Sequence, residues 1–361
     1  MRKLATVREI SAIRPIEGAD RIVVAQVDGW ECVVQKDAFH VGEHIVYVEV
    51  DSVVPERPEF EFLRNRKFRV RTIKLRGQVS QGLVLPLSIL PNGTGCDLGD
   101  NVTDALGITK YDPEAQQEAQ LLTRQPQVPK SAFERFFMRF KWYRKLFMKP
   151  KRKGGFPDWI TKTDETRIQN LTTLFETERN KGTKFSVTEK MDGQSATYYL
   201  RRVSRRKYEF GVCSRNIRLG EPDTSSYWTV AKKYNIEDVL KQLIGEHETI
   251  VLQGEICGNQ IQGNKYHICG YELFAFNLIY PDHKCGTAEI KELLEPYGIK
   301  TVPIVEENKE LPSTIGELVE YSKGHSVIRS GQKREGVVMR NVQRNISFKV
   351  INPDFLLAEK D

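Results

Sequence analysis

Hydrophobic and polar residues alternate through most of the first 112 residues, in short runs separated by turn signals. Residues 21–35 alternate on both sides of Asp28-Gly29, a dipeptide typical of two-residue hairpins. Residues 44–50 predict another strand, and residues 68–75 alternate basic or polar with apolar residues, as a half-exposed strand should. Residues 76–86 then return the chain across the predicted barrel. Strands that close within about a hundred residues predict a small β-barrel.

The pattern changes between residues 113 and 156. Glutamine and proline dominate first, and Ser131–Glu134 then forms a capping box that predicts the start of a helix. Phenylalanines recur at helical spacing, the opposite face is basic, and Pro150 ends the pattern. This basic helix could dock on a domain with its charges in solvent, follow nucleic-acid phosphates, or lie on a membrane surface.

From residue 157 onward, strand and helix patterns are mixed, which predicts an α+β domain. Two predicted helices, 225–245 and 287–298, each end at a glycine, and a third covers 313–324. The predicted strands are 188–199, 208–214, 249–257, 266–278, 335–340 and 346–351.

Composition fits a soluble globular protein of two or three domains. The 361 residues are 39% hydrophobic and 29% charged, and no apolar run is long enough for a membrane span. The first residues lack the apolar core of a signal peptide, so an intracellular location is expected. Six cysteines without Cys-x-x-Cys spacing predict reduced thiols and argue against zinc. The net charge of +7 points towards a polyanionic partner.

The most informative motif is Lys190-Met-Asp-Gly193, which ends a β-rich run. Four further motifs follow it in order: Cys213-Ser-Arg-Asn216, Gln253-Gly-Glu-Ile-Cys-Gly258, Phe274-Ala-Phe-Asn277 with Glu335-Gly-Val-Val-Met339, and Ser347-Phe-Lys349. The intervals are 65 residues from Lys190 to Glu255 (255 minus 190), 80 to Glu335 (335 minus 255) and 14 to Lys349 (349 minus 335). Alone, each residue has an ordinary explanation: a strand-end carboxylate, a core phenylalanine, a surface lysine or a turn.

Together, these residue types suit phosphoryl chemistry. A lysine amine that attacks a phosphorus atom must be neutral, although an ordinary lysine, with a pKa of about 10.4, is protonated at pH 7. A second cation nearby, such as Lys349 or a phosphate-bound metal, lowers that pKa by repulsion. Carboxylates are hard oxygen ligands suited to Mg²⁺ or Mn²⁺.

The ordered set resembles the covalent nucleotidyltransferases, which include polynucleotide ligases and mRNA capping enzymes. The resemblance implies that Lys190 forms a lysyl–AMP phosphoramidate from ATP and that Glu189 reads the adenine amino group, which favours ATP over GTP. The roles implied for the other residues are a metal site at Glu335 and Asp192, sugar or 3′-OH strand contacts from Arg215 and Asn216, a ribose contact from Glu255, base stacking by Phe276 and Val337, and an α-phosphate contact from Lys349. Upstream, Arg167 could contact nucleotide or pyrophosphate, or Asp164 could simply cap a helix.

The N-terminal barrel resembles tRNA-binding OB modules in the pattern Leu75-Arg-Gly-Gln-Val-Ser-Gln-Gly-Leu83. The chain stops 12 residues after Lys349 (361 minus 349), so the OB domain that most DNA ligases carry there is not expected. The inverted order resembles the small RNA ligases of the Deinococcus type. It implies an OB domain at 1–112, a linker with the basic helix at 113–156 and a nucleotidyltransferase domain at 157–361. Ser347 and Ser195 depart from lysine and asparagine positions of related RNA ligases.

The predicted function is therefore ATP-dependent RNA ligation of 3′-OH and 5′-phosphate ends, expected at nicks. RNA is the expected partner, and neither a membrane nor an obligate protein partner is expected. The alternatives are a DNA ligase with rearranged domains, a capping-type guanylyltransferase, and a non-catalytic RNA-binding protein on a ligase scaffold.

Overall fold

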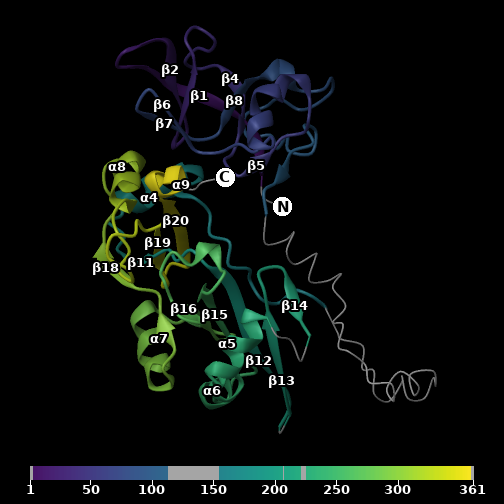
Figure 1. The fold of residues 1–361 in the computed structure, drawn as a ribbon, viewed down its shortest axis with the longest axis vertical. Helices are drawn as coiled ribbons and strands as arrows, with labels where there is room; N and C mark the ends of the chain where they lie inside the picture. Colours follow the sequence, from purple (N-terminus) through teal and green to yellow (C-terminus); the bar gives the residue numbers. More distant parts are fainter. Residues whose placement is uncertain (1–2, 113–153, 206, 221–224, 359–361) are drawn as a thin grey trace, which may run out of the picture. The chain divides into compact units, whose positions relative to one another are not determined.

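The computed structural model describes residues 3–112, 154–205, 207–220 and 225–358. The predicted basic helix within residues 131–153 lies outside the described residues. The chain forms two compact units (Figure 1). The first unit comprises Met1–Tyr111, Glu165–Lys190 and Val305–Asp361, and the second comprises Asp112–Asp164 and Met191–Ile304. The sequence-based domain boundaries remain a prediction.

An antiparallel five-stranded half-barrel occupies the N-terminal part of the first unit. Its strand order is β3-β2-β1-β4-β8, built from β1 (Ala5–Ile16), β2 (Ala19–Val27), β3 (Trp30–Gln35), β4 (His44–Val48) and β8 (Leu83–Pro86). The predicted hairpin at Asp28-Gly29 is confirmed, because β2 and β3 pair on either side of it. Alternate residues of β4 enter two apolar clusters, Val46 and Val48 in one and Ile45 and Tyr47 in the other, so both faces of the strand are covered.

Short strand pairs complete this part: β5 (Ser52–Val53) with β9 (Thr109–Lys110), and β6 (Ile73–Leu75) with β7 (Gln78–Ser80). The predicted strand 68–75 is therefore too long. Lys67 and Phe68 both adopt left-handed backbone angles, with φ of 52° and 58°, and an extended strand cannot pass through them.

A four-stranded sheet forms the rest of the first unit, in the order β18-β11-β19-β20. Its strands are β18 (Ile304–Lys309), β11 (Phe185–Glu189), β19 (Gly336–Asn341) and β20 (Ile346–Ile351), accompanied by the helices α4 (Thr172–Asn180), α8 (Ile315–Ser322) and α9 (Pro353–Ala358). Phe185, Val187, Val337, Met339 and Phe348 alternate onto one face of this sheet and pack with Phe175 and Leu318 of the helices.

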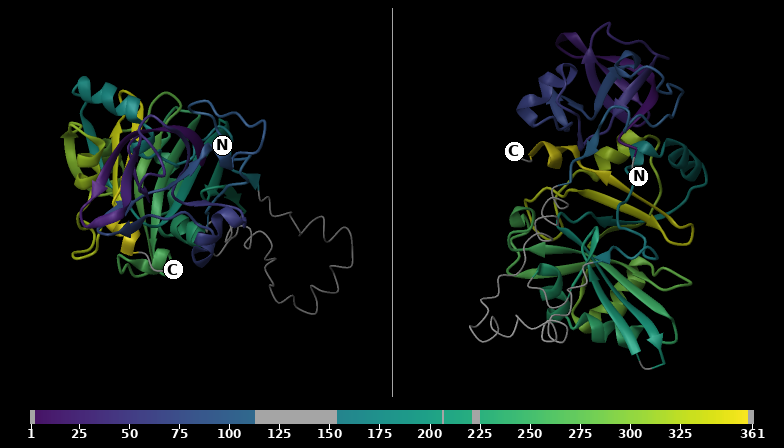
Figure 2. Two further views of the ribbon diagram at one scale, coloured as in Figure 1. Left: turned by 90° about the horizontal axis from the view of Figure 1, so that it is seen from above. Right: turned by 90° about the vertical axis from the view of Figure 1, so that its right-hand side faces the viewer.

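The second unit is a seven-stranded sheet in the order β10-β14-β13-β12-β15-β16-β17, and the right-hand view of Figure 2 shows its long central strands side by side. The strands are β10 (Gly154–Gly155), β14 (Ile217–Leu219), β13 (Lys207–Cys213), β12 (Gln194–Ser204), β15 (Thr249–Gly258), β16 (Tyr271–Ile279) and β17 (Lys300–Thr301). Helices α5 (Ser226–Lys233), α6 (Ile236–Leu243) and α7 (Thr287–Leu294) cover one face through a large apolar cluster.

Three predicted elements are wrong in extent. The strand predicted at 188–199 is two strands in two sheets, because β11 ends at Glu189 and β12 begins at Gln194. The helix predicted at 225–245 breaks at Asn235, whose φ of 48° cannot continue a right-handed helix. The strand predicted from residue 266 begins only at Tyr271, after a segment in which several residues have positive φ.

None of the helices within the described ranges has the length and apolar character to cross a membrane. All six cysteines are free thiols.

Candidate active site

Lys190 directly follows β11, and pairing of that strand with β19 brings it to Glu335. Glu189 lies opposite Val337 in the antiparallel register, and the Lys190 N–H donates to the Gly336 carbonyl at 3.0 Å. The Lys190 Nζ lies 2.6 Å from Glu335 Oε2, with the two side chains 25% and 15% exposed. Two residues that the sequence singled out, 145 positions apart, thus form a partly buried ion pair.

The backbone around Glu335 is held on both sides. Buried Arg334 donates to three carbonyls at the end of α8, those of Tyr321, Ser322 and Lys323. Asn352 donates its backbone N–H to the Glu335 carbonyl and its side-chain amide to the Arg334 carbonyl. These bonds fix where β19 begins and therefore where the carboxylate that meets Lys190 is presented.

Glu189 is a buried carboxylate with one oxygen committed. Its Oε2 accepts from the Val327 N–H at 2.8 Å, whereas its Oε1 has no partner among the described residues. Burial raises the pKa of Glu189, although the hydrogen bond from the Val327 N–H opposes the shift. Val337, its cross-strand neighbour, is fully buried in the apolar cluster. Val337 thus lies on the helix-covered face of the sheet, where its side chain has no surface to offer a base.

Lys349 lies on β20 opposite Val338, and its N–H donates to the Thr166 carbonyl at 2.9 Å. Two positions earlier, Ser347 donates its hydroxyl to Glu165 at 2.6 Å, and Arg340 also approaches Glu165 at 3.6 Å. At the position where the resemblance led us to expect a lysine, this chain has a serine held by a carboxylate.

Arg167 lies beside Lys349 and is buried. The two residues form a parallel bridge, and the guanidinium pairs with Asp51 of the half-barrel at 3.1 Å and lies over the Trp30 ring. Its Nε and Nη1 have no partner among the described residues. The alternative explanation of this segment, a helix cap at Asp164, is wrong because α4 begins after Leu171 without a side-chain cap.

In the second unit, Asp192 is fixed by two residues that the sequence did not single out. Lys265 Nζ lies 2.6 Å from Asp192 Oδ2, and the Asp192 N–H donates to the Tyr266 hydroxyl at 2.8 Å. Gly193 then passes so close to β15 that a Cβ would lie 2.4 Å from the Ile256 carbonyl oxygen and 2.9 Å from Glu255 Cγ. The Asp-Gly turn of the motif is thus also a close-packing requirement.

Glu255 lies on β15, opposite Ser195 of β12 and Phe274 of β16. Phe274 is buried, whereas Phe276 is partly buried and packs with Met191, Tyr266 and other apolar residues. Arg215 pairs with Asp164 at 3.2 Å, and the Asn216 N–H donates to the Ser214 hydroxyl at 3.4 Å. The second unit therefore brings together Asp192, Glu255 and Phe276 around one end of its sheet.

Sequence reasoning missed the supporting residues Lys265, Tyr266, Val327, Arg334 and Asn352. Lys265 and Tyr266 fall in a segment of irregular backbone, and Val327 acts through its main chain. None of these residues belongs to a recognisable motif, and their roles follow only from contacts made over long sequence separations.

Known families and solved structures match both parts of this chain. Residues 4–87 match a family model described as an OB-fold domain, and residues 183–351 match the RNA ligase family. A solved structure of Naegleria gruberi RNA ligase, a mutant with AMP and Mn, is 33% identical over 100% of both chains, with a TM-score of 0.80. This chain belongs to the RNA ligase family. Its N-terminal half-barrel is an OB-fold, and the RNA ligase domain follows, as the sequence predicted.

Two further structures of the Naegleria gruberi RNA ligase agree. A mutant with ATP and Mn is 33% identical over 100% of both chains, with a TM-score of 0.80. The complex with PPi is 33% identical, covers 99% of this chain and 98% of that chain, and has a TM-score of 0.79. A comparison with curated proteins found no match.

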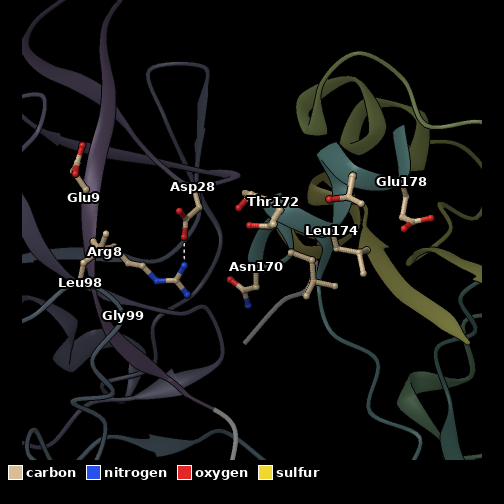
Figure 3. A pocket seen from close by; sticks show the side chains of 12 residues that line it. Arg8, Glu9, Asp28, Leu98, Gly99, Asn170, Thr172, Leu174 and Glu178 are labelled. Atoms are coloured by element: carbon tan, nitrogen blue, oxygen red, sulfur yellow. Dashed lines mark hydrogen bonds and ion pairs between the residues drawn. The ribbon is translucent and has the colours of Figure 1, made fainter. Parts of the chain in front are cut away.

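This RNA ligase family member also has a cavity of about 770 Å³ in its first unit, away from Lys190. Figure 3 shows Arg8 paired with Asp28 on one side and Asn170, Thr172 and Leu174 on the other. Glu9 and Glu178 also line the cavity, and Glu178 is paired with Arg344. Arg8, the one cation among the lining residues, is already paired with Asp28, so the cavity is poorly suited to a phosphate.

A group of potential metal ligands lies in the second unit at His283, Cys285 and Glu289, whose ligand atoms are within 4.8 Å of one another. Each has a structural explanation. The His283 ring stacks on that of Tyr280, with centroids 4.7 Å apart. Burial raises the pKa of Cys285 to about 12, which disfavours the thiolate that binds metals. Glu289 accepts from the Gly286 N–H in a capping box at the start of α7. The group is explained without a metal.

Proposed function

We propose that this protein is an ATP-dependent RNA ligase that joins 3′-OH and 5′-phosphate ends through an adenylate on Lys190. The observation that carries the proposal is the 2.6 Å contact between Lys190 Nζ and Glu335. The partly buried carboxylate holds the amine in place, and a divalent metal that took the place of the amine at Glu335 would favour the neutral, nucleophilic form of the amine by repulsion. The Naegleria gruberi structures with ATP, AMP, Mn and PPi support the same chemistry.

Glu189 supports adenine as the base. Its Oε2 is fixed by Val327, and its Oε1 has no partner among the described residues. A buried acceptor of this kind gains most from a donor such as the adenine amino group, whereas guanine offers its O6 acceptor at that position. Phe276, which is partly buried, would stack on the base.

Glu335 and Asp192 would hold the divalent metal, either directly or through water. Glu335 pairs with Lys190 and Asp192 pairs with Lys265, so at each carboxylate a metal ion would take the place of a lysine ammonium. The metal would neutralise charge on the phosphates. Lys349 would contact the α-phosphate, Arg167 would contact the β- and γ-phosphates, and Glu255, Arg215 and Asn216 would contact the sugar or the 3′-OH strand.

The proposed reaction has three steps. In the first, the neutral Lys190 amine forms a bond to the α-phosphorus of ATP, pyrophosphate leaves, and the amine loses a proton. In the second, a 5′-phosphate oxygen displaces Lys190 and takes the AMP. In the third, a 3′-OH attacks that end, loses its proton, and releases AMP as the phosphodiester forms. The OB-fold would hold the RNA through its phosphates.

The substrate is proposed to be an RNA nick or a pair of RNA ends, with no obligate protein partner. Free thiols at all six cysteines support the predicted intracellular location.

The test is covalent labelling. The full-length protein, incubated with α-labelled ATP and Mg²⁺ or Mn²⁺, should acquire a label that Lys190→Ala abolishes. Lys184→Ala removes an exposed lysine six positions earlier and should label normally. A label that persists in Lys190→Ala would refute the nucleophile. Labelling by GTP instead of ATP would favour a guanylyltransferase, and sealing that tolerates deoxyribose at the 3′-OH side would favour a DNA ligase.

A further inference from the structure

One face of the seven-stranded sheet carries an aromatic and basic surface that the reaction above does not use. It consists of Phe156, Trp159, Lys162, Tyr199 and Arg218, here named the Trp159 patch, all within the second unit. The opposite face of the sheet packs on the helices through residues such as Tyr198, Leu200 and Leu252. The patch therefore lies on the face that the helices leave uncovered.

Trp159 is the exposed member, with 41% of its surface accessible. Its ring meets that of Tyr199 edge-on, with centroids 5.3 Å apart and an interplanar angle of 81°. Burial of a tryptophan ring is ordinarily favourable. A partly exposed indole held in one orientation therefore offers a surface that a ligand could cover.

Tyr199 is the support beneath it. It lies opposite Gly211 in the register of β12 and β13, and a Cβ at Gly211 would be 2.1 Å from its ring. The glycine therefore makes room for the tyrosine to lie across the neighbouring strand. Burial raises the pKa of Tyr199 to about 12, so the ring stays neutral at physiological pH. Tyr199, which supports Trp159, is therefore positioned by the sheet itself and not by a loop.

Cations flank the aromatic rings. Lys162 Nζ lies 5.6 Å from the centroid of Phe156, and the Arg218 guanidinium lies 5.5 Å from that of Tyr199. Arg218 also pairs with Glu209 at 2.7 Å. Exposed Arg201 follows on the same side of β12. Stacking rings bordered by cations suit single-stranded nucleic acid, because bases stack on the rings while cations meet the phosphates.

The patch is continuous with the nucleotide-binding end of the same face. Ser195 lies opposite Glu255, and Tyr199 lies four residues further along β12 on the same side. Four residues of strand span about 13 Å, which corresponds to about four stacked bases at 3.4 Å each. Residues 161–163, which follow Trp159, are fixed to this face of the sheet by two hydrogen bonds. Gln253 donates to the Thr161 carbonyl, and the Thr163 and Ser195 hydroxyls bond to each other.

We propose that the Trp159 patch binds a base of the RNA substrate a few nucleotides from the joined ends, with Trp159 stacking on it. This inference rests on the proposed function of RNA ligation. The partner is RNA and not a protein, because the exposed ring is bordered by cations and lies on the face that carries Glu255.

The test compares Trp159→Ala, Trp159→Phe and wild-type full-length protein on an RNA whose 5′ end is already adenylylated, so that only strand joining is measured. Loss of one base–aromatic stacking contact predicts a fall of about 10- to 100-fold in kcat/KM for Trp159→Ala, largely through KM, and partial rescue by Trp159→Phe. Tyr297→Ala removes a partly buried aromatic ring on the helix-covered side of the same unit, away from the Trp159 patch, and should seal normally.

A second readout is the intrinsic fluorescence of Trp159. Titration with an RNA oligonucleotide should quench wild-type emission more strongly than that of Trp159→Phe. If the wild type forms no covalent adenylate with ATP, the proposed function fails. If it labels and seals but Trp159→Ala joins the adenylylated RNA at the wild-type rate with unchanged KM, the patch is not an RNA site, and the proposed function stands.

Discussion

At the scale of single residues, the proposed nucleotide site contains charged side chains that are each held by a protein partner and could also bind the nucleotide or the metal. Glu189 is the clearest case, because one carboxylate oxygen is fixed by Val327 and the other has no partner among the described residues. Lys190 meets Glu335, and Asp192 meets Lys265, so the carboxylates proposed to hold metal are balanced by amines.

Glu189→Gln should weaken base selection. A glutamine side chain can turn its amide to donate to guanine O6, so the preference for ATP over GTP in covalent labelling is expected to fall by about 10-fold, the equivalent of one hydrogen bond. Lys190→Ala in the same background should remove both labels. Unchanged discrimination in Glu189→Gln would show that another group reads the base.

The same substitution has a pH-dependent effect on stability. Because burial raises the pKa of Glu189 in the folded protein, the fold loses stability as pH rises from the unfolded to the folded pKa, and the penalty is complete above the latter. Glu189→Gln should therefore unfold at a higher temperature than wild type at pH 7. The difference should vanish at low pH, where the carboxyl is protonated in both states. A lower melting temperature at pH 7 would contradict this account.

Gly193→Ala tests close packing at the motif. Its Cβ would lie 2.4 Å from the Ile256 carbonyl oxygen, so β15 must shift at Glu255. Such overpacking is expected to cost about 1–3 kcal/mol in the free energy of unfolding and to lower the rate of self-labelling. Gly154→Ala is the matched control, because nothing lies within 4 Å of the corresponding Cβ. Chemical denaturation of both variants measures the difference.

At the scale of elements, strand pairing positions the site more than any single motif does. The β11–β19 pair aligns Glu189 with Val337 and places Lys190 beside Glu335, and the β12–β15 pair aligns Ser195 with Glu255. The break between β11 and β12 falls on the Lys190–Gly193 motif, so this motif connects a strand of one sheet to a strand of the other.

The break between α5 and α6 offers an element-scale test. Asn235 adopts a left-handed conformation there, with a φ of 48°. Asn235→Ala should lower the free energy of unfolding by about 1–2 kcal/mol, since alanine tolerates this region poorly. Asn235→Gly should be close to neutral. Equal stability of the alanine and glycine variants in thermal unfolding would mean that the two helices join in another way.

At the scale of the whole molecule, the OB-fold belongs to the same compact unit as part of the ligase domain. Within that unit, Trp30 donates to Asn170 at 2.7 Å, Asn170 donates to Glu49 at 2.7 Å, and Asp51 pairs with Arg167. Gly29 approaches so closely that a Cβ would lie 2.8 Å from Gln169 Cα. The OB-fold therefore contacts the segment that carries Arg167.

Gly29→Ala should loosen this contact without touching Lys190. Hydrogen exchange in residues 165–170 is expected to rise, and RNA sealing is expected to fall more than self-labelling, because the OB-fold would serve the RNA steps. Gly154→Ala again serves as the control. If sealing falls no more than labelling, the OB-fold does not serve the RNA steps in particular. Full nick sealing by residues 157–361 alone would lead to the same conclusion.

The sequence by itself determined the fold class and the family. The barrel hairpin at Asp28-Gly29, the α+β character of the second half and the family followed from local periodicity and ordered motifs, because alternation and turn chemistry are encoded within a few residues. The roles of Lys190 and its partners remain predictions, although the contact between Lys190 and Glu335 agrees with them.

Only the tertiary structure decided where strands and helices stop and what supports the motifs. The breaks at Lys190–Gly193 and Asn235 depend on backbone angles and close approaches that periodicity does not register. Lys265, Arg334 and the Trp159 patch act through contacts between distant segments. Such contacts exist only once the sheets have formed, which is why local sequence patterns could not predict them.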